Sequence, residues 1–453
     1  MSLKFGTDGV RGVANDELTP ELVLALGRAA ARVLGADRAY LVGRDTRISG
    51  PLLQSALTAG LASEGASVVD LGVMPTPGVA CLAAAQGCMG AVVSASHNPF
   101  ADNGIKFLAQ GGLKLSDSIE GQLEAELSAV LSETADTVRH TGSAIGRVTA
   151  DNGEAAAWYE RQLVASLEGR RLDGLSVVLD GANGAAYAIA SRVFEAAGAT
   201  VSVLHDQPNG VNINEHCGST HPEELQAAVR EAGADIGLAF DGDADRVLAV
   251  DGVGDIVDGD HILAICALDR RERGALRDDT LVVTTMTNLG LRLAMERHGI
   301  SVAETDVGDR YILEAMAANG WTLGGEQSGH IVFRDLATTG DGQLTGLQLM
   351  DVMSRTGKPL AELAAVMTRL PQVMINVRNV DCPGLDDAAA VWAAVDVEVK
   401  ALGDTGRVVL RRSGTEPIIR VMVEAPEQTK ANDVAARIAA VVEAELALGW
   451  PLS

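Results

Sequence analysis

The chain has 453 residues, and its 36 Lys and Arg against 61 Asp and Glu give a formal net charge of −25 at pH 7. At roughly 150 residues per domain this length suggests about three domains, and 47% hydrophobic residues with 50 glycines favour Ala-rich helices on sheets over disorder. The acidic balance argues against a nucleic-acid or anionic-membrane partner, and it requires that any anionic substrate be attracted by local cations.

The five cysteines are scattered, and no CxxC pair occurs among them. This pattern is typical of core thiols in a reduced compartment rather than of a disulfide frame or a zinc site. The first residues, MSLKFGTDGVRG, lack the apolar core of a signal peptide, and no apolar run approaches the length of a membrane span. We therefore expect a cytoplasmic protein.

Three segments repeat one order of strand, polar turn, Ala/Leu-rich helix, glycine and second strand. They cover residues 39–72, 176–205 and 280–306, and the glycines that close their helices are Gly65, Gly198 and Gly299. A glycine after an amphipathic helix supplies a left-handed cap, so each segment is predicted to be a βαβ unit. Such units predict mixed or parallel sheets with ligand sites at the carboxyl ends of the strands.

The last part of the chain has a different pattern. Residues 407–428 indicate strand, loop and strand, and residues 429–449 indicate one long amphipathic helix. A short helix with a linker is expected before them. The fold class is therefore α/β with four domains around a central cleft, three of them similar mixed α/β domains and the fourth a smaller α+β domain. The predicted boundaries are 1–145, 146–250, 251–360 and 361–453.

The segment SASHNP (94–99) follows a β-branched strand. Its proline biases Asn98 toward an extended conformation, which places Ser94 and Ser96 on a constrained turn. A hydroxyl at a strand end beside His97 is suited to be a nucleophile or a phosphate carrier, and a turn cap is the alternative.

The segment DGDADR (241–246) lies between two apolar strands. Alternating carboxylates of Asp241, Asp243 and Asp245 on one tight loop can converge on a hard cation such as Mg²⁺ or Ca²⁺. Without a counter-ion they would repel one another, so an ordinary acidic turn is the weaker interpretation. Arg246 beside them suits a phosphate that bridges to the metal.

Two further loops carry polar side chains between glycines. GEQSGH (325–330) offers Glu326, Ser328 and His330, which suit sugar hydroxyls, although a plain polar loop fits equally well. RRSGTEP (411–417) places guanidinium, hydroxyl and exposed backbone N–H groups on one turn, which predicts a phosphate cradle, with an ordinary hairpin as the alternative. The cradle residues are Arg411, Ser413, Gly414 and Thr415. Near the start, GTDGVRG and GRDTRISG add three cations, namely Arg11, Arg44 and Arg47.

The chain resembles the α-D-phosphohexomutase superfamily over essentially its whole length. The motifs that carry the resemblance are, in this order, SASHNP, DGDADR, GEQSGH and RRSGTEP. GTDGVRG, DNGIKF (102–107), VGDRYI (307–312), GEQSGH and TTGDG (338–342) are most similar to its bacterial members that act on glucosamine phosphates. Relatives that act on mannose and glucose phosphates usually carry Met where this chain has Gln327. The last motif departs from the usual pattern by having Arg412 in place of Pro, which adds a cation near the phosphate loop.

The resemblance implies an isomerase that interconverts glucosamine 6-phosphate and glucosamine 1-phosphate on the route to UDP-N-acetylglucosamine. It implies a phosphoserine at Ser96, a 1,6-bisphosphate intermediate that also acts as activator, and one Mg²⁺ held by Ser96, Asp241, Asp243 and Asp245. The implied catalytic residues are Ser96, Lys106, Arg11 and His330. The implied substrate-binding residues are Arg246, Glu326, Ser328, Arg411, Ser413, Gly414, Thr415 and Arg420.

The implied partner is a small-molecule sugar phosphate, with no nucleic acid and no membrane, and a homodimer is one option for the assembly. Three alternatives remain at this point. A phosphomannomutase or phosphoglucomutase would keep the chemistry and change the sugar, and a sugar-phosphate sensor would need neither Ser96 nor the three aspartates. A haloacid-type phosphatase would release free phosphate and usually has Thr or Val where Asp245 stands.

Overall fold

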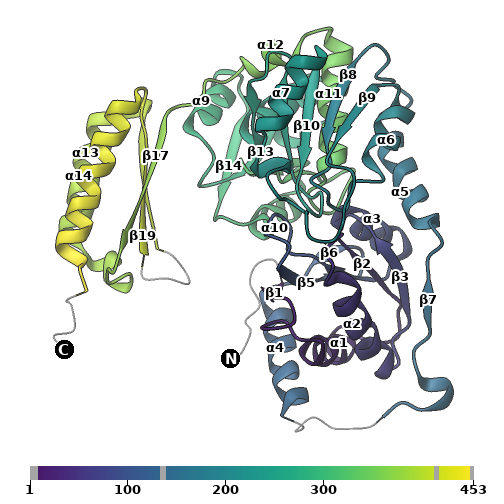
Figure 1. Cartoon of the computed structure of the whole chain (residues 1–453). Helices are drawn as coiled ribbons and strands as arrows, with labels where there is room; N and C mark the ends of the chain where they lie inside the picture. The colour runs from purple at the N-terminus through teal and green to yellow at the C-terminus, as the bar shows by residue number, and fades with distance from the viewer. Residues whose placement is uncertain (1–8, 133–138, 413–417, 449–453) are drawn as a thin grey trace. The chain divides into compact units, whose positions relative to one another are not determined.

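The computed structural model describes residues 9–132, 139–412 and 418–448 (Figure 1). The chain divides into two compact units, one formed by Met1–Met286 with Gly299–Val366 and the other by Thr287–His298 with Met367–Ser453. None of the described helices is both long and apolar enough to cross a membrane. Three sheets with their helices build the first unit, and a fourth, smaller sheet builds the second, which confirms the predicted four-part α/β architecture.

The first sheet has the strand order β1-β5-β4-β2-β3-β7, with β6 beside β5. Strands β4, β2, β3 and β7 are parallel, whereas β5 is antiparallel to both β4 and β1. The predicted first βαβ unit is present as β2-α2-β3, with Gly65 at φ +89° after the helix. The strands are β1 (Val10–Val13), β2 (Tyr40–Arg44), β3 (Val68–Val73), β4 (Met89–Val93), β5 (Asp102–Ala109), β6 (Leu113–Lys114) and β7 (Val148–Ala150). The helices are α1 (Pro20–Leu34), α2 (Gly50–Ser63), α3 (Thr76–Gln86), α4 (Asp117–Leu131) and η1 (Gly142–Ala144).

Helices cover both faces of this sheet. Residues of α1, α2 and α4 form one buried cluster with β2, β4 and β5, while α3 packs on β2 and β4. A Cβ on Gly43 of β2 would lie only 2.7 Å from Cγ2 of Val79, so glycine lets α3 approach the strand closely. The amino end of α3 is thereby brought to the carboxyl ends of the parallel strands.

The second sheet has the order β12-β11-β10-β8-β9, in which β9, β8 and β10 are parallel and β11 and β12 continue antiparallel. The second predicted βαβ unit is β8-α6-β9, and Gly198 caps α6 at φ +106°. The strands are β8 (Ser176–Asp180), β9 (Thr200–Leu204), β10 (Ile236–Phe240), β11 (Val247–Asp251) and β12 (Ile256–Val257). The helices are α5 (Glu154–Ala165), α6 (Ala190–Ala197), η2 (Gly218–Thr220) and α7 (Glu223–Ala232).

The third sheet has the order β14-β13-β15-β16, with β14, β13 and β15 parallel and β16 antiparallel. Its α10 packs with β13 in a buried cluster, and α11 reaches back to contact β10 and β11 of the second sheet. The strands are β13 (Thr280–Thr284), β14 (Ser301–Thr305), β15 (Leu323–Gly325) and β16 (Ile331–Phe333). The helices are α8 (Gly259–Glu272), η3 (Arg277–Asp279), α10 (Asp309–Asn319), α11 (Gly342–Thr356) and α12 (Leu360–Ala364).

The second unit is an antiparallel sheet in the order β17-β19-β18 whose one face is covered by α13 and α14. Helix α9, which lies between β13 and β14 in the chain, belongs to this unit, because buried Glu424 accepts hydrogen bonds from Asn288 Nδ2 (3.1 Å) and Leu289 N (3.0 Å). The remaining elements are α9 (Leu289–Arg297), β17 (Gln372–Arg378), η4 (Pro383–Asp387), α13 (Ala389–Leu402), η5 (Gly403–Thr405), β18 (Arg407–Arg412), β19 (Ile418–Glu424) and α14 (Gln428–Leu446).

Asp341 links helices α5 and α11 of the first unit. Its carboxylate caps α11 by accepting from the backbone N–H groups of Gln343 and Leu344, both at 3.0 Å, and it also accepts from the Tyr159 hydroxyl of α5 at 2.8 Å. Burial raises the pKa of Asp341 from 3.8 to about 6, although these donors favour the charged form.

We expect Asp341→Asn to change the pH dependence of stability. A carboxyl whose pKa is raised by folding stabilises the fold while it is protonated, and this contribution is lost as the pH rises from about 4 through about 6. Asparagine mimics the neutral form at every pH. The free energy of unfolding of the variant minus that of the wild type should therefore increase by up to about 3 kcal/mol from pH 4 to pH 7. Urea denaturation at both pH values measures this difference, and a constant offset would contradict it.

Candidate active site

Ser96 lies in the turn that follows the fully buried strand β4. Its backbone is left-handed, with φ +54°, which is a strained conformation for a residue other than glycine. The Ser96 N–H donates to Ser94 Oγ at 3.0 Å, and Ser94 Oγ donates to Asp45 Oδ2 at 2.6 Å. Ser94 is thus committed to holding the turn, while the Ser96 hydroxyl is turned toward the acidic loop.

Two donors from outside the turn fix its carbonyl groups. The guanidinium of Arg47 donates to the carbonyl oxygens of Ser96 (3.0 Å) and Asn98 (2.9 Å), and Asn214 Nδ2 donates to the same two oxygens at 2.9 and 3.0 Å. Arg47 also donates to Asp45 Oδ2 at 2.9 Å, and neither side chain is exposed to solvent. The sequence pattern suggested that Arg47 is a surface cation that attracts phosphate. The structure contradicts this, because the Arg47 guanidinium is buried and paired with Asp45.

The three aspartates of DGDADR lie on the loop between β10 and β11, and all three are buried. Ala244 adopts φ +59°, which tightens the loop, and one carboxylate oxygen of each aspartate lies within 4.8 Å of the others. The Ser96 hydroxyl donates to Asp241 Oδ2 at 2.6 Å. The predicted convergence of Ser96 with the acidic loop is therefore present in the first unit.

These carboxylates suit a divalent cation. Among the residues that the structure describes, none donates a hydrogen bond to the buried Asp243 Oδ1 or Asp245 Oδ1, and buried carboxylate oxygens rarely remain without a donor. Burial and the charges of the other two aspartates raise the pKa of Asp241 well above its usual range. A dipositive ion would remove this repulsion, and oxygen ligands at this spacing match Mg²⁺.

Cationic and imidazole groups surround the same loop. Lys106 Nζ donates to Asp243 Oδ2 at 2.9 Å and lies 3.6 Å from Asp245 Oδ2. Burial alone would raise the pKa of Asp245, but the charges of Lys106, His330 and Arg246 hold it well below its usual range. His330 is only 2% exposed, with Nδ1 at 3.8 Å from Asp245 Oδ1. Lys106 and His330 are thus placed beside the acidic loop.

Arg246 and His97 bring positive charge close to Ser96. Arg246 Nη1 lies 3.3 Å from His97 Nδ1, which in turn lies 3.3 Å from Ser96 Oγ. Burial and then the charges of Arg246 and Arg11 lower the pKa of His97, which favours the neutral imidazole. Arg11 also lies near the serine turn, because a Cβ on Gly104 would be 2.7 Å from the Ser94 carbonyl oxygen and 3.1 Å from Arg11 Cγ.

The GEQSGH loop joins β15 to β16 and packs on the strand that leaves the acidic loop. Val247 N donates to the carbonyl of Gly329 at 3.1 Å, and a Cβ on Gly329 would lie 2.0 Å from the Val247 carbonyl oxygen. Glu326 and Ser328 are in contact at 3.5 Å on this loop. A small cavity of about 30 Å³, lined by Lys106, Asp245 and Thr339 among others, lies on the same part of the unit.

The RRSGTEP loop belongs to the second unit. Arg411 of β18 is directly opposite Arg420 of β19, on the face of the sheet that α13 and α14 leave open. Arg412 is ion-paired with Asp386 at 3.0 Å. Ser413, Gly414 and Thr415, predicted for the phosphate cradle, lie outside the described residues.

The structure adds three residues around the acidic loop and the serine turn that were not predicted as site residues. Thr76 donates its hydroxyl to Asp243 Oδ2 at 2.7 Å, and Asn214 comes from a long loop of the second domain. Asp309 lies 3.3 Å from His330 Nε2. The only sequence signals are that Thr76 starts a helix and that Asp309 lies in VGDRYI.

Comparisons with known proteins agree with this arrangement. Models of the phosphoglucomutase/phosphomannomutase family match residues 2–134 (alpha/beta/alpha domain I), 158–254 (domain II), 258–370 (domain III) and 374–441 (C-terminal domain). A phosphoglucosamine mutase of Corynebacterium efficiens is 54% identical, with 98% of this chain and 99% of the relative covered. One of Salinispora tropica is 55% identical over 97% of this chain and 98% of its own.

Among solved structures, a phosphoglucomutase/phosphomannomutase family protein from Burkholderia thailandensis has a TM-score of 0.81. The two chains are 25% identical, and the match covers 99% of each. The four family models, the full-length relatives and the shared fold therefore establish that the chain is a mutase and belongs to the phosphoglucomutase/phosphomannomutase family of the α-D-phosphohexomutase superfamily.

Proposed function

We propose that this mutase interconverts glucosamine 6-phosphate and glucosamine 1-phosphate and so supplies UDP-N-acetylglucosamine synthesis. The observation that carries the proposal is the contact of the Ser96 hydroxyl with an aspartate triad, in a chain 54–55% identical over almost its full length to phosphoglucosamine mutases. Gln327, where mannose- and glucose-specific relatives usually have Met, favours the amino sugar within the same family.

In the proposed reaction Ser96 carries the phosphoryl group. The P–Oγ bond of phosphoserine breaks as a bond forms from phosphorus to O1 of the 6-phosphate, and the O1 proton passes to a base. The resulting 1,6-bisphosphate then turns round. The bond from O6 to phosphorus breaks as a new bond forms from phosphorus to Ser96 Oγ, and O6 takes up a proton, so that glucosamine 1-phosphate leaves and Ser96 is phosphorylated again. Lys106 and His330 are the proposed acid and base, since both lie against the acidic loop.

Asp241, Asp243 and Asp245 would hold the Mg²⁺ together with an oxygen of phosphoserine, and the ion would neutralise charge on the transferring group. Arg246 and Arg11 add positive charge around Ser96, and His97, whose lowered pKa favours the neutral form, adds no negative charge. The strained turn at Ser96, held by Arg47 and Asn214, keeps Oγ aimed at the metal loop.

Glu326 and Ser328 are proposed to bind the sugar hydroxyls, and Arg411 and Arg420 the phosphate that is not reacting. The paired arginines support the second role, because like charges directly opposite each other on a sheet are destabilising unless an anion lies between them. Ser413, Gly414 and Thr415 complete the proposed cradle.

The proposal is tested by incubating the phosphorylated protein with glucosamine 6-phosphate, Mg²⁺ and a trace of sugar 1,6-bisphosphate. We expect glucosamine 1-phosphate to form, to cease forming with a chelator, and to return on addition of Mg²⁺. Values of kcat/KM for the glucosamine, glucose and mannose phosphates then rank the substrates. A preference for mannose or glucose would reassign the sugar, and no conversion of any of them would refute the function.

Lys106→Met tests the proposed role of the lysine. Removing the ammonium group should raise the Mg²⁺ affinity several-fold, since its charge competes with the ion for Asp243 and Asp245. Turnover should nevertheless fall by about 100-fold because an acid–base group is lost. Mg²⁺ titrations of turnover measure both effects, with Lys358→Met, at an exposed ion pair with Glu362, as control. An unchanged Mg²⁺ affinity would contradict the competition.

A further inference from the structure

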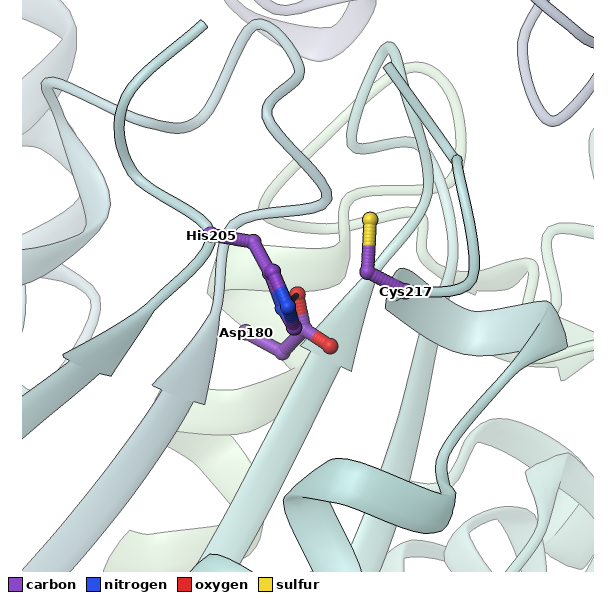
Figure 2. Close-up of side chains that lie close together, drawn as sticks. All are labelled: Asp180, His205 and Cys217. Carbon is purple, nitrogen blue, oxygen red and sulfur yellow. Dashed lines mark hydrogen bonds and ion pairs between the residues drawn. The ribbon is translucent and has the colours of Figure 1, made fainter. Parts of the chain in front are cut away.

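A second group of ligand-type side chains lies in the second domain, apart from the acidic loop. Asp180 ends β8, His205 follows the parallel neighbour β9, and Cys217 precedes η2, so three distant segments meet at the carboxyl edge of the sheet (Figure 2). One carboxylate oxygen, one imidazole nitrogen and the sulfur all lie within 4.8 Å of one another. This is the distance range over which a single ion can bind all three.

The donor types differ from those of the acidic loop. A carboxylate, an imidazole and a thiol together suit Zn²⁺ and related transition metals, whereas three carboxylates suit Mg²⁺. Asp180 and Cys217 are fully buried, and the His205 side chain, which is 20% exposed, gives a path for entry. We propose that Asp180, His205 and Cys217 form a second metal site, of the Zn²⁺ type, in this protein.

The neighbouring groups orient these side chains as they would around a metal. His205 Nε2 lies 3.2 Å from Glu224 Oε2, so it can donate its proton there and leave the lone pair of Nδ1 for the ion. His205 Nδ1 faces Asp180 Oδ1 at 3.0 Å. The backbone N–H groups of Ala182 (2.9 Å) and Gly218 (2.8 Å) fix the Asp180 carboxylate.

The local charge also favours a cation. Burial and then the carboxylates of Asp180, Glu224 and Glu215 raise the pKa of the Cys217 thiol to about 12, so the sulfur keeps its proton until a metal ion displaces it. The competing arrangement is metal-free, with a protonated His205 between Asp180 and Glu224. Cys217 is a ligand in the metal-bound arrangement, whereas it has no role in the metal-free one.

A metal ion at this site would connect the two ends of the loop 206–216, because His205 directly precedes the loop and Cys217 directly follows it. That loop carries Asn214, which donates to the carbonyls of Ser96 and Asn98. A metal clip would therefore hold in place one of the two donors that fix the serine turn. The role proposed for the metal is structural, and it does not depend on which sugar phosphate the enzyme uses.

Cobalt(II) distinguishes this site from the acidic loop, because only a thiolate ligand gives a sulfur-to-cobalt charge-transfer band. We expect the full-length protein in saturating Mg²⁺ to bind one Co²⁺ with such a band, and Zn²⁺ to abolish the band by competition. The band should disappear in Cys217→Ser and in Cys217→Ala. It should remain in Cys266→Ser, a matched buried thiol on α8, and in Asp243→Asn.

Hydrogen exchange provides the structural readout. Zn²⁺ should slow hydrogen exchange in residues 206–216 at least tenfold in the wild type. It should not change the exchange rate of these residues in Cys217→Ala. Circular dichroism of each variant checks that it is folded. A wild-type protein without the band, or a band that persists in both Cys217 variants, would overturn the proposal in favour of the protonated His205 arrangement. Neither outcome would bear on the mutase reaction.

Discussion

Replacing Ser96 with alanine should abolish turnover, with a loss on the order of 10⁴- to 10⁶-fold, as expected when the group that carries a covalent intermediate is removed. The Ser96 Oγ is the hydroxyl of its turn that faces the aspartate triad, at 2.6 Å from Asp241 Oδ2. The backbone should change little, because alanine and serine meet a similar cost at φ +54°. The loss would therefore reflect chemistry rather than misfolding.

Intact mass and turnover are the paired measurements for this variant. Wild-type protein incubated with a sugar 1,6-bisphosphate should gain one phosphate-sized increment, and Ser96→Ala should gain none. Ser55→Ala, an exposed position on α2, is the matched control and should keep both the increment and the turnover. A phosphorylated, active Ser96→Ala protein would move the carrier to another residue.

Ser94 does not qualify as that other carrier. Its Oγ donates to Asp45 Oδ2 and accepts from the Ser96 N–H, and the residue is fully buried. The sequence alone left either serine free to act, since both precede the same His-Asn-Pro. The choice between them came from the family resemblance, and the structure adds a physical reason for it.

The periodic parts of the fold were accessible from the sequence because they depend on local patterns. Strand, helix and glycine recur at β2-α2-β3 and β8-α6-β9, and Gly65 and Gly198 adopt the positive φ that their positions predicted. The acidic loop was accessible for the same reason, since its aspartates are two residues apart. Their repulsion in a buried loop follows from the spacing alone.

Contacts between distant segments were not accessible in this way. Nothing in the pattern of GRDTRISG separates a surface arginine from one that is buried against Asp45, and Arg47 proved to be the second kind. Asn214, from a loop, and Thr76, at the start of α3, reach the site from segments with no motif of their own. The partner of α9 was equally hidden, because an amphipathic helix specifies an apolar face and not the sheet that covers it.

Arg47→Met should be the most destabilising of the substitutions considered. It keeps much of the side-chain volume but leaves Asp45 as a buried carboxylate without its counter-charge, which costs about 3–5 kcal/mol when a buried ion pair is broken from one side. The double variant Arg47→Met/Asp45→Leu removes both charges and should recover part of that loss. Urea denaturation of the three proteins should therefore rank wild type first, the double variant second and Arg47→Met last.

Activity separates the role of Arg47 in positioning Ser96 from its role in stability. The double variant lacks the guanidinium donors to the carbonyls of Ser96 and Asn98 and keeps only Asn214 there, so its kcat should fall while KM stays near that of the wild type. Arg47→Lys keeps a positive charge for Asp45, but an ammonium group cannot donate to several distant acceptors at once. Relative to Arg47→Met, it should therefore restore stability more than kcat. A double variant with wild-type kcat would show that Asn214 alone holds the serine turn. Equal recovery of stability and kcat in Arg47→Lys would show that charge, rather than the geometry of the guanidinium, is what the turn requires.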